Sequence, residues 1–161
     1  MLARLPAGTT IFVDANIFLY HVLNVSSVCS DFFERARRRT VQAYTSPIVL
    51  SEVLHQTMLA ELGEQHPVRP SGALRLLRRR PELIETLRKT PEIMRQIGHW
   101  RIRVLPLRWR EIVLAAELTQ RYHLLTNDAL IVATMRAHRL THLASNDRDF
   151  ARVPGLTRWR P

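Results

Sequence analysis

The sequence predicts an α/β fold built around a mostly parallel central sheet. Short apolar segments rich in β-branched residues alternate along the chain with longer segments of helical periodicity. Strands that alternate with helices form parallel sheets, because each helix carries the chain back to the edge from which the next strand starts. The 161 residues, 46% of them hydrophobic and 24% charged, suit one globular domain with a proper core. We therefore expect a single domain over residues 1–161.

Each element of the first half of the chain has a local signal. Residues 9–13 are short, β-branched and apolar, as in a buried strand. Residues 27–39 have apolar residues on one side and arginines at the end, where positive charge complements the helix dipole. Residues 41–45 read as a second strand. Ser46 and Pro47 are a usual cap and first-turn pair for a helix that continues to about Gly63.

The second half follows the same signals. Residues 64–70 interrupt the helical pattern, and Pro106 stops a third strand. Thr126, Asn127 and Asp128 are residues that cap helices. The elements expected here are helices over 71–80, 81–97, 109–122 and 126–138, and strands over 102–105, 141–144 and 156–159.

The chain is strongly basic, with a formal net charge of +10. Lys89 is the only lysine, so 23 of the 24 basic residues are arginine. Arginine offers a rigid fork that matches phosphate, and a small basic protein has nucleic acid as its leading partner. A genome-wide bias towards arginine codons is an alternative cause of the Arg/Lys ratio, although it does not explain the net charge. The candidates for phosphate contacts are Arg78, Arg79, Arg80, Arg148 and the arginines at 35 and 37–39, and the alternative for such runs is a solvated helix end.

Cysteine content and hydropathy limit the other possibilities. Cys29 stands alone, so neither an intrachain disulfide nor a cysteine zinc site is available. The first residues lack the pattern of a signal peptide, and no apolar run approaches membrane-spanning length. We expect a cytoplasmic protein without membrane contact.

Four acidic residues occupy unusual positions. Asp14 ends the first predicted strand, Glu52 and Asp128 lie within apolar helical stretches, and Asp147 follows the fourth strand. Carboxylates are seldom buried unless they are paired or bind a metal. Taken singly, each has a simpler explanation, as a helix cap, a solvated helix residue or part of a polar turn. Together they predict a shared acidic pocket.

Such a pocket needs a cation. Ligands of open α/β sheets bind at the carboxyl ends of the strands, where these acids are expected to converge. Magnesium and manganese prefer oxygen ligands. A cation of this kind polarises a phosphoryl oxygen and lowers the pKa of bound water. Asn16 is suited to orient a ligating carboxylate or a bound water.

Four segments around these acids resemble the motifs of PIN-domain nucleases, in the family's order and across nearly the whole chain. They are residues 11–20, 46–53, 127–134 and 143–150. The resemblance implies a PIN-like α/β/α sandwich with a four- to five-stranded sheet. It also implies a metal-dependent endoribonuclease that uses Mg²⁺ or Mn²⁺. The residues implied around the metal are Asp14, Glu52, Asp128 and Asp147, with Asp149 as the competing fourth acid and Asn16 and Asn146 in support.

Among PIN domains the sequence most resembles VapC-type toxins of toxin–antitoxin pairs. That resemblance implies an RNA substrate, an antitoxin partner and a homodimer. Two alternatives stay open, a non-catalytic PIN-fold module that binds RNA or protein, and a PIN nuclease of RNA maturation without an antitoxin. One departure concerns length, because Glu52 and Asp128 lie 76 positions apart (128 − 52). We expect the extra length to be an Arg-rich helical insertion or dimerisation element at about 64–100.

Overall fold

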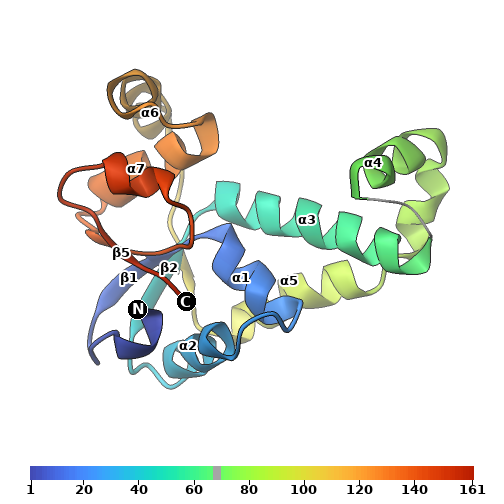
Figure 1. Ribbon diagram of the computed structural model, residues 1–161, viewed down its shortest axis with the longest axis horizontal. Coiled ribbons are helices and arrows are strands. Elements are labelled where there is room, and N and C mark those ends of the chain that lie inside the picture. The colour runs from blue at the N-terminus through green and yellow to red at the C-terminus, as the bar shows by residue number, and fades with distance from the viewer. Residues whose placement is uncertain (67–69) are drawn as a thin grey trace.

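A computed structural model, which describes residues 1–66 and 70–161, contains one all-parallel sheet (Figure 1). Its strand order is β3-β2-β1-β4-β5. The strands are β1 (Thr10–Val13), β2 (Gln42–Thr45), β3 (Arg103–Val104), β4 (His142–Ala144) and β5 (Thr157–Trp159). The predicted α/β fold is confirmed, and the sheet has the upper number of expected strands, five.

Helices cover both faces of the sheet. The chain moves from β1 to β2 to β3 in one direction and then crosses back to β4, so right-handed crossovers place α6 and α7 on the face opposite α1, α2 and α5. Figure 1 shows these two layers. The helices are α1 (Ala15–Val22), α2 (Ser27–Arg37), α3 (Pro47–Gln65), α4 (Pro70–Arg79), α5 (Lys89–His99), α6 (Trp109–Tyr122) and α7 (Thr126–Ala137), with 3₁₀ turns η1 (Leu2–Arg4), η2 (Pro81–Thr86) and η3 (Asp149–Arg152). None of the helices described is both long and apolar enough to cross a membrane.

One predicted helix is wrong. The segment 81–97 is not continuous, because η2 ends at Thr86 and α5 starts at Lys89. Pro91 explains the break, since a helix through this point would need its missing N–H and would drive its ring into the carbonyl of Leu87. The interruption expected at 64–70 is partly helical, because α3 continues to Gln65. Residues 67–69 of this predicted interruption lie outside the described residues.

Buried apolar side chains of the described residues form two hydrophobic clusters. The main core lies between the sheet and its helices, and Trp100 packs against it by stacking on Phe33, with ring centroids 4.6 Å apart. The second cluster joins α3, α4 and η2 through Leu62, Ala73, Leu77, Leu83 and Leu87. We call the carboxyl-terminal half of α3, with α4 and η2, the helical arm. Figure 1 shows it extending away from the sheet. That this region is an insertion or a dimerisation element stays a prediction.

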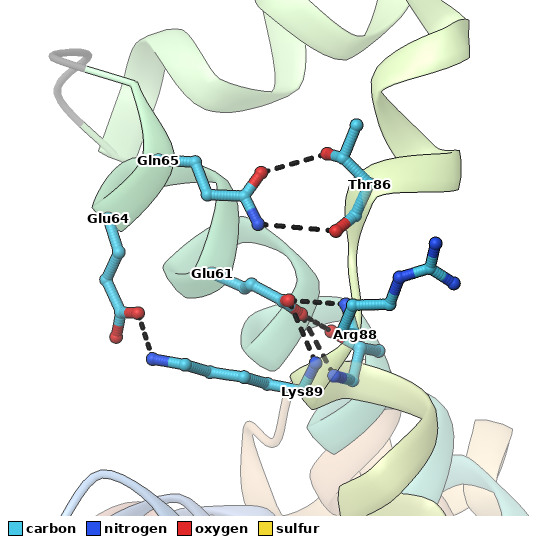
Figure 2. Close-up of polar contacts among 7 residues, drawn as sticks. Glu61, Glu64, Gln65, Thr86, Arg88 and Lys89 are labelled. Carbon is cyan, nitrogen blue, oxygen red and sulfur yellow. Dashed lines mark hydrogen bonds and ion pairs between the residues drawn. The ribbon is translucent and has the colours of Figure 1, made fainter.

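A buried carboxylate fastens the helical arm to α5 (Figure 2). Glu61, which is 4% exposed, accepts hydrogen bonds from the backbone N–H of Arg88 at 2.6 Å and of Lys89 and Thr90 at 2.9 Å. The Thr90 hydroxyl donates a fourth bond at 2.9 Å. Burial raises the pKa of Glu61, but these hydrogen bonds outweigh it and the pKa is lowered. The carboxylate therefore satisfies backbone donors at the start of α5 that have no partner within the helix.

Candidate active site

Asp14 lies at the point where the strand order reverses. Its backbone N–H donates to the carbonyl of Ala144 at 3.1 Å, which links the ends of the neighbouring strands β1 and β4. One carboxylate oxygen, Oδ1, accepts from the N–H of Ala15 at 2.7 Å and caps α1. The helix-cap explanation is therefore correct for one oxygen of Asp14. The side chain is only 6% exposed, so the second oxygen also needs partners.

That second oxygen, Oδ2, is held from two directions. The hydroxyl of Ser145 donates to it at 2.6 Å, and Nδ2 of Asn16 donates at 2.5 Å. Oδ1 of Asn16 in turn accepts from the N–H of Asn146 at 3.0 Å. The predicted supporting residues Asn16 and Asn146 thus join the Asp14 network. Ser145, which is completely buried, is not among the residues predicted from the sequence. Its only local signal is a polar residue directly after a buried strand.

Asp14 and Asp128 have strongly raised pKa values. Burial raises the pKa of Asp14 to about 6, opposed by the hydrogen bonds from Ser145 and Ala15 and assisted by the charges of Glu52 and Asp147. Burial also raises the pKa of Asp128 to about 7, with contributions from the charges of Asp147, Asp14, Asp149 and Glu52. The structure therefore places all five predicted acids within electrostatic reach of this end of the sheet.

The three other acids of the predicted pocket differ in position and exposure. Glu52, in the second turn of α3, and Asp128 are half-buried, and Asp147 is exposed. The predicted cap at 126–128 is wrong, because Leu125 is the N-cap residue and helix α7 starts at Thr126 without a side-chain cap. Asp128 instead lies in the first turn of α7, where a negative charge interacts favourably with the helix dipole.

Asp147 and Asp149 differ in what surrounds them. Oδ1 of Asp147 accepts from the N–H of Asp149 at 2.8 Å, and Asp149 forms an ion pair with Arg152 at 2.8 Å. The charge of Asp147 raises the pKa of both Asp14 and Asp128, whereas that of Asp149 raises only the pKa of Asp128. These differences favour Asp147 as the fourth acid, which stays a prediction.

The donor set suits a hard divalent cation. It consists of carboxylate oxygens whose charges repel one another, and opposite charge relieves that repulsion. The hydroxyl of Ser46, buried at the end of β2 beside β1, also lacks a hydrogen-bond partner among the described atoms. Within residues 1–66 and 70–161, no group of three or more His, Cys, Asp or Glu side chains is placed so that it could hold one metal ion. The residues fit the cation by their chemistry.

The predicted phosphate-contact arginines are mostly remote from these acids. Arg78 and Arg79 end α4 and Arg80 follows it, on the helical arm, and Arg80 pairs with Glu82 at 2.9 Å. At a rise of about 1.5 Å per residue, the path along α3 from Glu52 to the arm's core is already about 15 Å. Arg148 is exposed beside Asp147. Arg158, which was not predicted, donates to the carbonyls of Asn146 and Asp147 at 3.2 and 2.5 Å and so holds the loop after β4.

Comparison with known proteins agrees with the fold of this chain. The model of the PIN domain family matches residues 11–156. Ribonuclease VapC2 of Methanocaldococcus jannaschii is 27% identical over 146 residues, 91% of this chain and 90% of that protein. The crystal structure of the sarcin-ricin loop cleaving toxin VapC20 from Mycobacterium tuberculosis is similar with a TM-score of 0.62 and 19% identity, over 94% of this chain and 99% of the other.

A second solved structure has the same fold. It is a toxin–antitoxin complex from Klebsiella pneumoniae, similar with a TM-score of 0.55 and 20% identity, over 91% of this chain and 95% of the other. The family model spans the four motifs around Asp14, Glu52, Asp128 and Asp147, and the sheet from Ile11 of β1 through β4. This chain belongs to the PIN-domain family.

Proposed function

We propose that this protein is a divalent-metal-dependent endoribonuclease that hydrolyses RNA phosphodiester bonds as the toxin of a toxin–antitoxin pair. The observation that carries the proposal is the buried Asp14 carboxylate. Ser145 and Asn16 hold it at the switch point of the sheet, within electrostatic reach of Glu52, Asp128 and Asp147. Support for RNA as the substrate comes from the name of one similar protein, a ribonuclease, and from the net charge of +10. Another similar protein is named a sarcin-ricin loop cleaving toxin.

The residues divide into two roles. Asp14, Asp128 and Asp147 would hold Mg²⁺ or Mn²⁺, and Glu52 would bind it or orient the attacking water. When bound, the cation supplies a polarised phosphoryl oxygen and a water of lowered pKa. Ser145 and Asn16 fix the direction of the Asp14 carboxylate, as residues behind metal ligands do. We propose no covalent nucleophile.

An Asp14→Asn variant tests this function. It keeps the size of the side chain and removes its charge, so cleavage of a mixed RNA substrate in Mg²⁺ or Mn²⁺ should fall by at least about a hundredfold. Asp31→Asn, an exposed aspartate of α2, is the matched control and should cut as the wild type does. If folded Asp14→Asn protein cuts RNA at the wild-type rate, the proposed mechanism is wrong.

The toxin role needs a separate experiment. One structural neighbour is a toxin–antitoxin complex, which supports an antitoxin partner for this chain. Inducible expression of the wild type should arrest growth and Asp14→Asn should be tolerated, whereas equal growth would favour an RNA-maturation nuclease. We also propose a cytoplasmic homodimer, as the resemblance to toxins of this class implies. Light scattering of the purified protein measures its oligomeric state.

A non-catalytic RNA-binding module is the competing function. The site argues against it, because a protein that only binds phosphate gains nothing from several carboxylates at the binding edge. A binder would show no thermal-shift response to Mn²⁺, whereas the proposed nuclease should be stabilised by the ion.

A further inference from the structure

A second pocket, away from the acids, is lined by arginines. It has a volume of about 520 Å³, within the ~300–1,000 Å³ usual for ligand sites, and lies at the β2–β3 edge of the sheet. Arg39, Arg101 and Arg103 contribute to its lining together with Gln42 and Tyr44. Gln42 is the first residue of β2, and Arg39 and Arg101 precede β2 and β3, so this part of the lining lies towards the end opposite the acids. Arg103 pairs in register with Tyr44 and extends the pocket along β2.

The positive charge of this pocket is not neutralised by the protein. Arg37 and Arg38 both pair with Glu34, at 2.7 and 2.5 Å. Among the described residues no acidic side chain forms an ion pair with Arg39, Arg101 or Arg103, and none lines the pocket. Three guanidinium groups that share one concave surface without a counter-charge form a site for an anion.

The pocket also has a flat surface on which a base can stack. Nη1 of Arg103 donates to the hydroxyl of Tyr44 at 3.2 Å, and its guanidinium lies 5.8 Å from the centre of the Tyr44 ring. Aromatic rings and guanidinium planes are the surfaces on which unpaired bases stack, independently of sequence. An acidic peptide would use the arginines but not this surface, so the combination favours single-stranded nucleic acid.

The backbone holds two of the arginines at the pocket. Arg39 follows α2 and Arg101 follows α5, both in the left-handed conformation with φ of 59° and 57°. Glycine is the favoured residue at such positions, and arginine there carries a conformational cost. Arg139 shares this conformation outside the pocket, so the strain alone does not identify the site. At the pocket, the left-handed conformation of Arg39 and Arg101 places side chains that follow two separate helices at the same edge of the sheet.

We propose that this pocket is a second contact site for the backbone and a base of a single RNA strand, remote from the cleavage site. The inference rests on the proposed nuclease function. At about 3.3 Å per residue, Gln42 lies three steps or about 10 Å before Thr45, so the pocket extends along β2 away from the acidic edge. Only an RNA strand of several nucleotides can therefore occupy the pocket and the cleavage site together, whereas a very short strand occupies only one of them.

The test compares RNA binding by two double variants in the absence of divalent metal. Arg101→Gln with Arg103→Gln changes the pocket. Arg139→Gln with Arg160→Gln is the control. These two arginines follow α7 and β5, away from the β3 edge of the sheet. Each double variant lowers the formal net charge by 2, from +10 to +8. Fluorescence anisotropy measures the affinity of a labelled RNA of about 12 nucleotides, a length in the range of single-strand sites. Arg39→Gln alone provides a second pocket variant.

The pocket variant should bind this RNA roughly tenfold more weakly, and the control within about twofold of the wild type. The slope of log affinity against log salt should fall by about 1.4 for two lost phosphate contacts. Inorganic phosphate should compete with RNA binding to the wild type and the control more strongly than with binding to the pocket variant, because the pocket binds an anion. A trinucleotide, which is too short to occupy both sites, should bind the wild type more weakly than the longer RNA does. Equal losses in both double variants would indicate only a general charge effect and overturn the proposal, as would a loss confined to binding of an acidic peptide.

Cleavage in Mg²⁺, measured separately, distinguishes the two proposals. If the wild type cuts RNA and the pocket variant binds the longer RNA normally, the pocket inference fails and the nuclease stands. If the wild type does not cut RNA but the pocket variant binds it more weakly, the pocket stands and the nuclease fails.

Discussion

Replacing Glu61 by alanine tests whether one buried carboxylate holds the helical arm to α5. The change removes four hydrogen bonds and leaves the N–H of Thr90, which is 6% exposed, without a partner. A buried unsatisfied donor costs about 1–3 kcal/mol and a lost helix cap about 1 kcal/mol. We therefore expect the free energy of unfolding to fall by about 3 kcal/mol, and the melting temperature by roughly 6–12 °C for a chain of this size.

Glu64→Ala is the matched control. Glu64 lies one turn further along α3 and also reaches α5, through an ion pair with Lys89, but both side chains are more than half exposed. Exposed ion pairs contribute little, so this variant should unfold close to the wild type. Urea unfolding followed by circular dichroism measures both variants. If Glu61→Ala and Glu64→Ala lose the same stability, Glu61 does not hold the arm as the structure indicates.

The Glu61 contribution also has a defined pH dependence. Because the folded state lowers the pKa of Glu61, its stabilisation is complete above the unfolded pKa of about 4.3 and disappears as pH falls through the folded value. The difference in stability between wild type and Glu61→Ala should therefore be constant near neutral pH and shrink in acid. A difference that grows as pH falls would contradict this reasoning.

Three further predictions concern the acidic site and the backbone. Ser145→Ala removes the hydroxyl that fixes Asp14 and should weaken Mn²⁺ binding about 10–100-fold in calorimetry. Ser145→Thr keeps a hydroxyl and should bind Mn²⁺ nearly as the wild type does. Equal Mn²⁺ binding by the wild type, Ser145→Ala and Ser145→Thr would refute the positioning role. Since folding raises the pKa values of Asp14 and Asp128 to about 6 and about 7, their contribution to stability without metal should be complete below pH 4 and lost as pH rises through these values. Mn²⁺ should in turn stabilise the protein more at pH 8 than at pH 5.5 in thermal melts, and a shift independent of pH would contradict the raised values. Arg139→Gly relieves a left-handed backbone with φ of 55° and should raise the free energy of unfolding by about 0.5–1 kcal/mol in urea, whereas a loss would show that the arginine side chain contributes more than the strain costs.

The sequence indicated the strands and helices because their signals are local. Hydrophobic periodicity and helix-starting residues such as Pro47 are recognised within a few positions of the chain, and most of the observed elements start and end close to the predicted bounds. The continuous helix over 81–97 was wrong because hydrophobic spacing was followed through Pro91, whose steric effect acts four residues earlier. Glu61 then provides hydrogen bonds for the new helix start from a distant helix, which no local pattern reveals.

The residues of the acidic site also divide into those that the sequence indicated and those that only the fold brings together. Asp14 and Asp128 were recognisable because an acid next to an apolar run is rare, whatever its surroundings. Ser145 was not, because its hydrogen bond to Asp14 spans 131 positions and exists only once β1 and β4 pair. The arginine pocket likewise combines residues that follow two different helices with residues of two strands. Charge composition indicated nucleic acid but not the place where it binds.

Manganese titration of the wild type and of Asp14→Asn by calorimetry, with RNA cleavage measured on the same samples, tests the central proposal most directly. The account predicts that the wild type binds the ion and cuts RNA only in its presence, and that Asp14→Asn loses both properties while its melting curve shows a folded protein. A wild type that cuts RNA equally well in a chelator, or an Asp14→Asn protein that binds manganese and cuts as the wild type does, would contradict it.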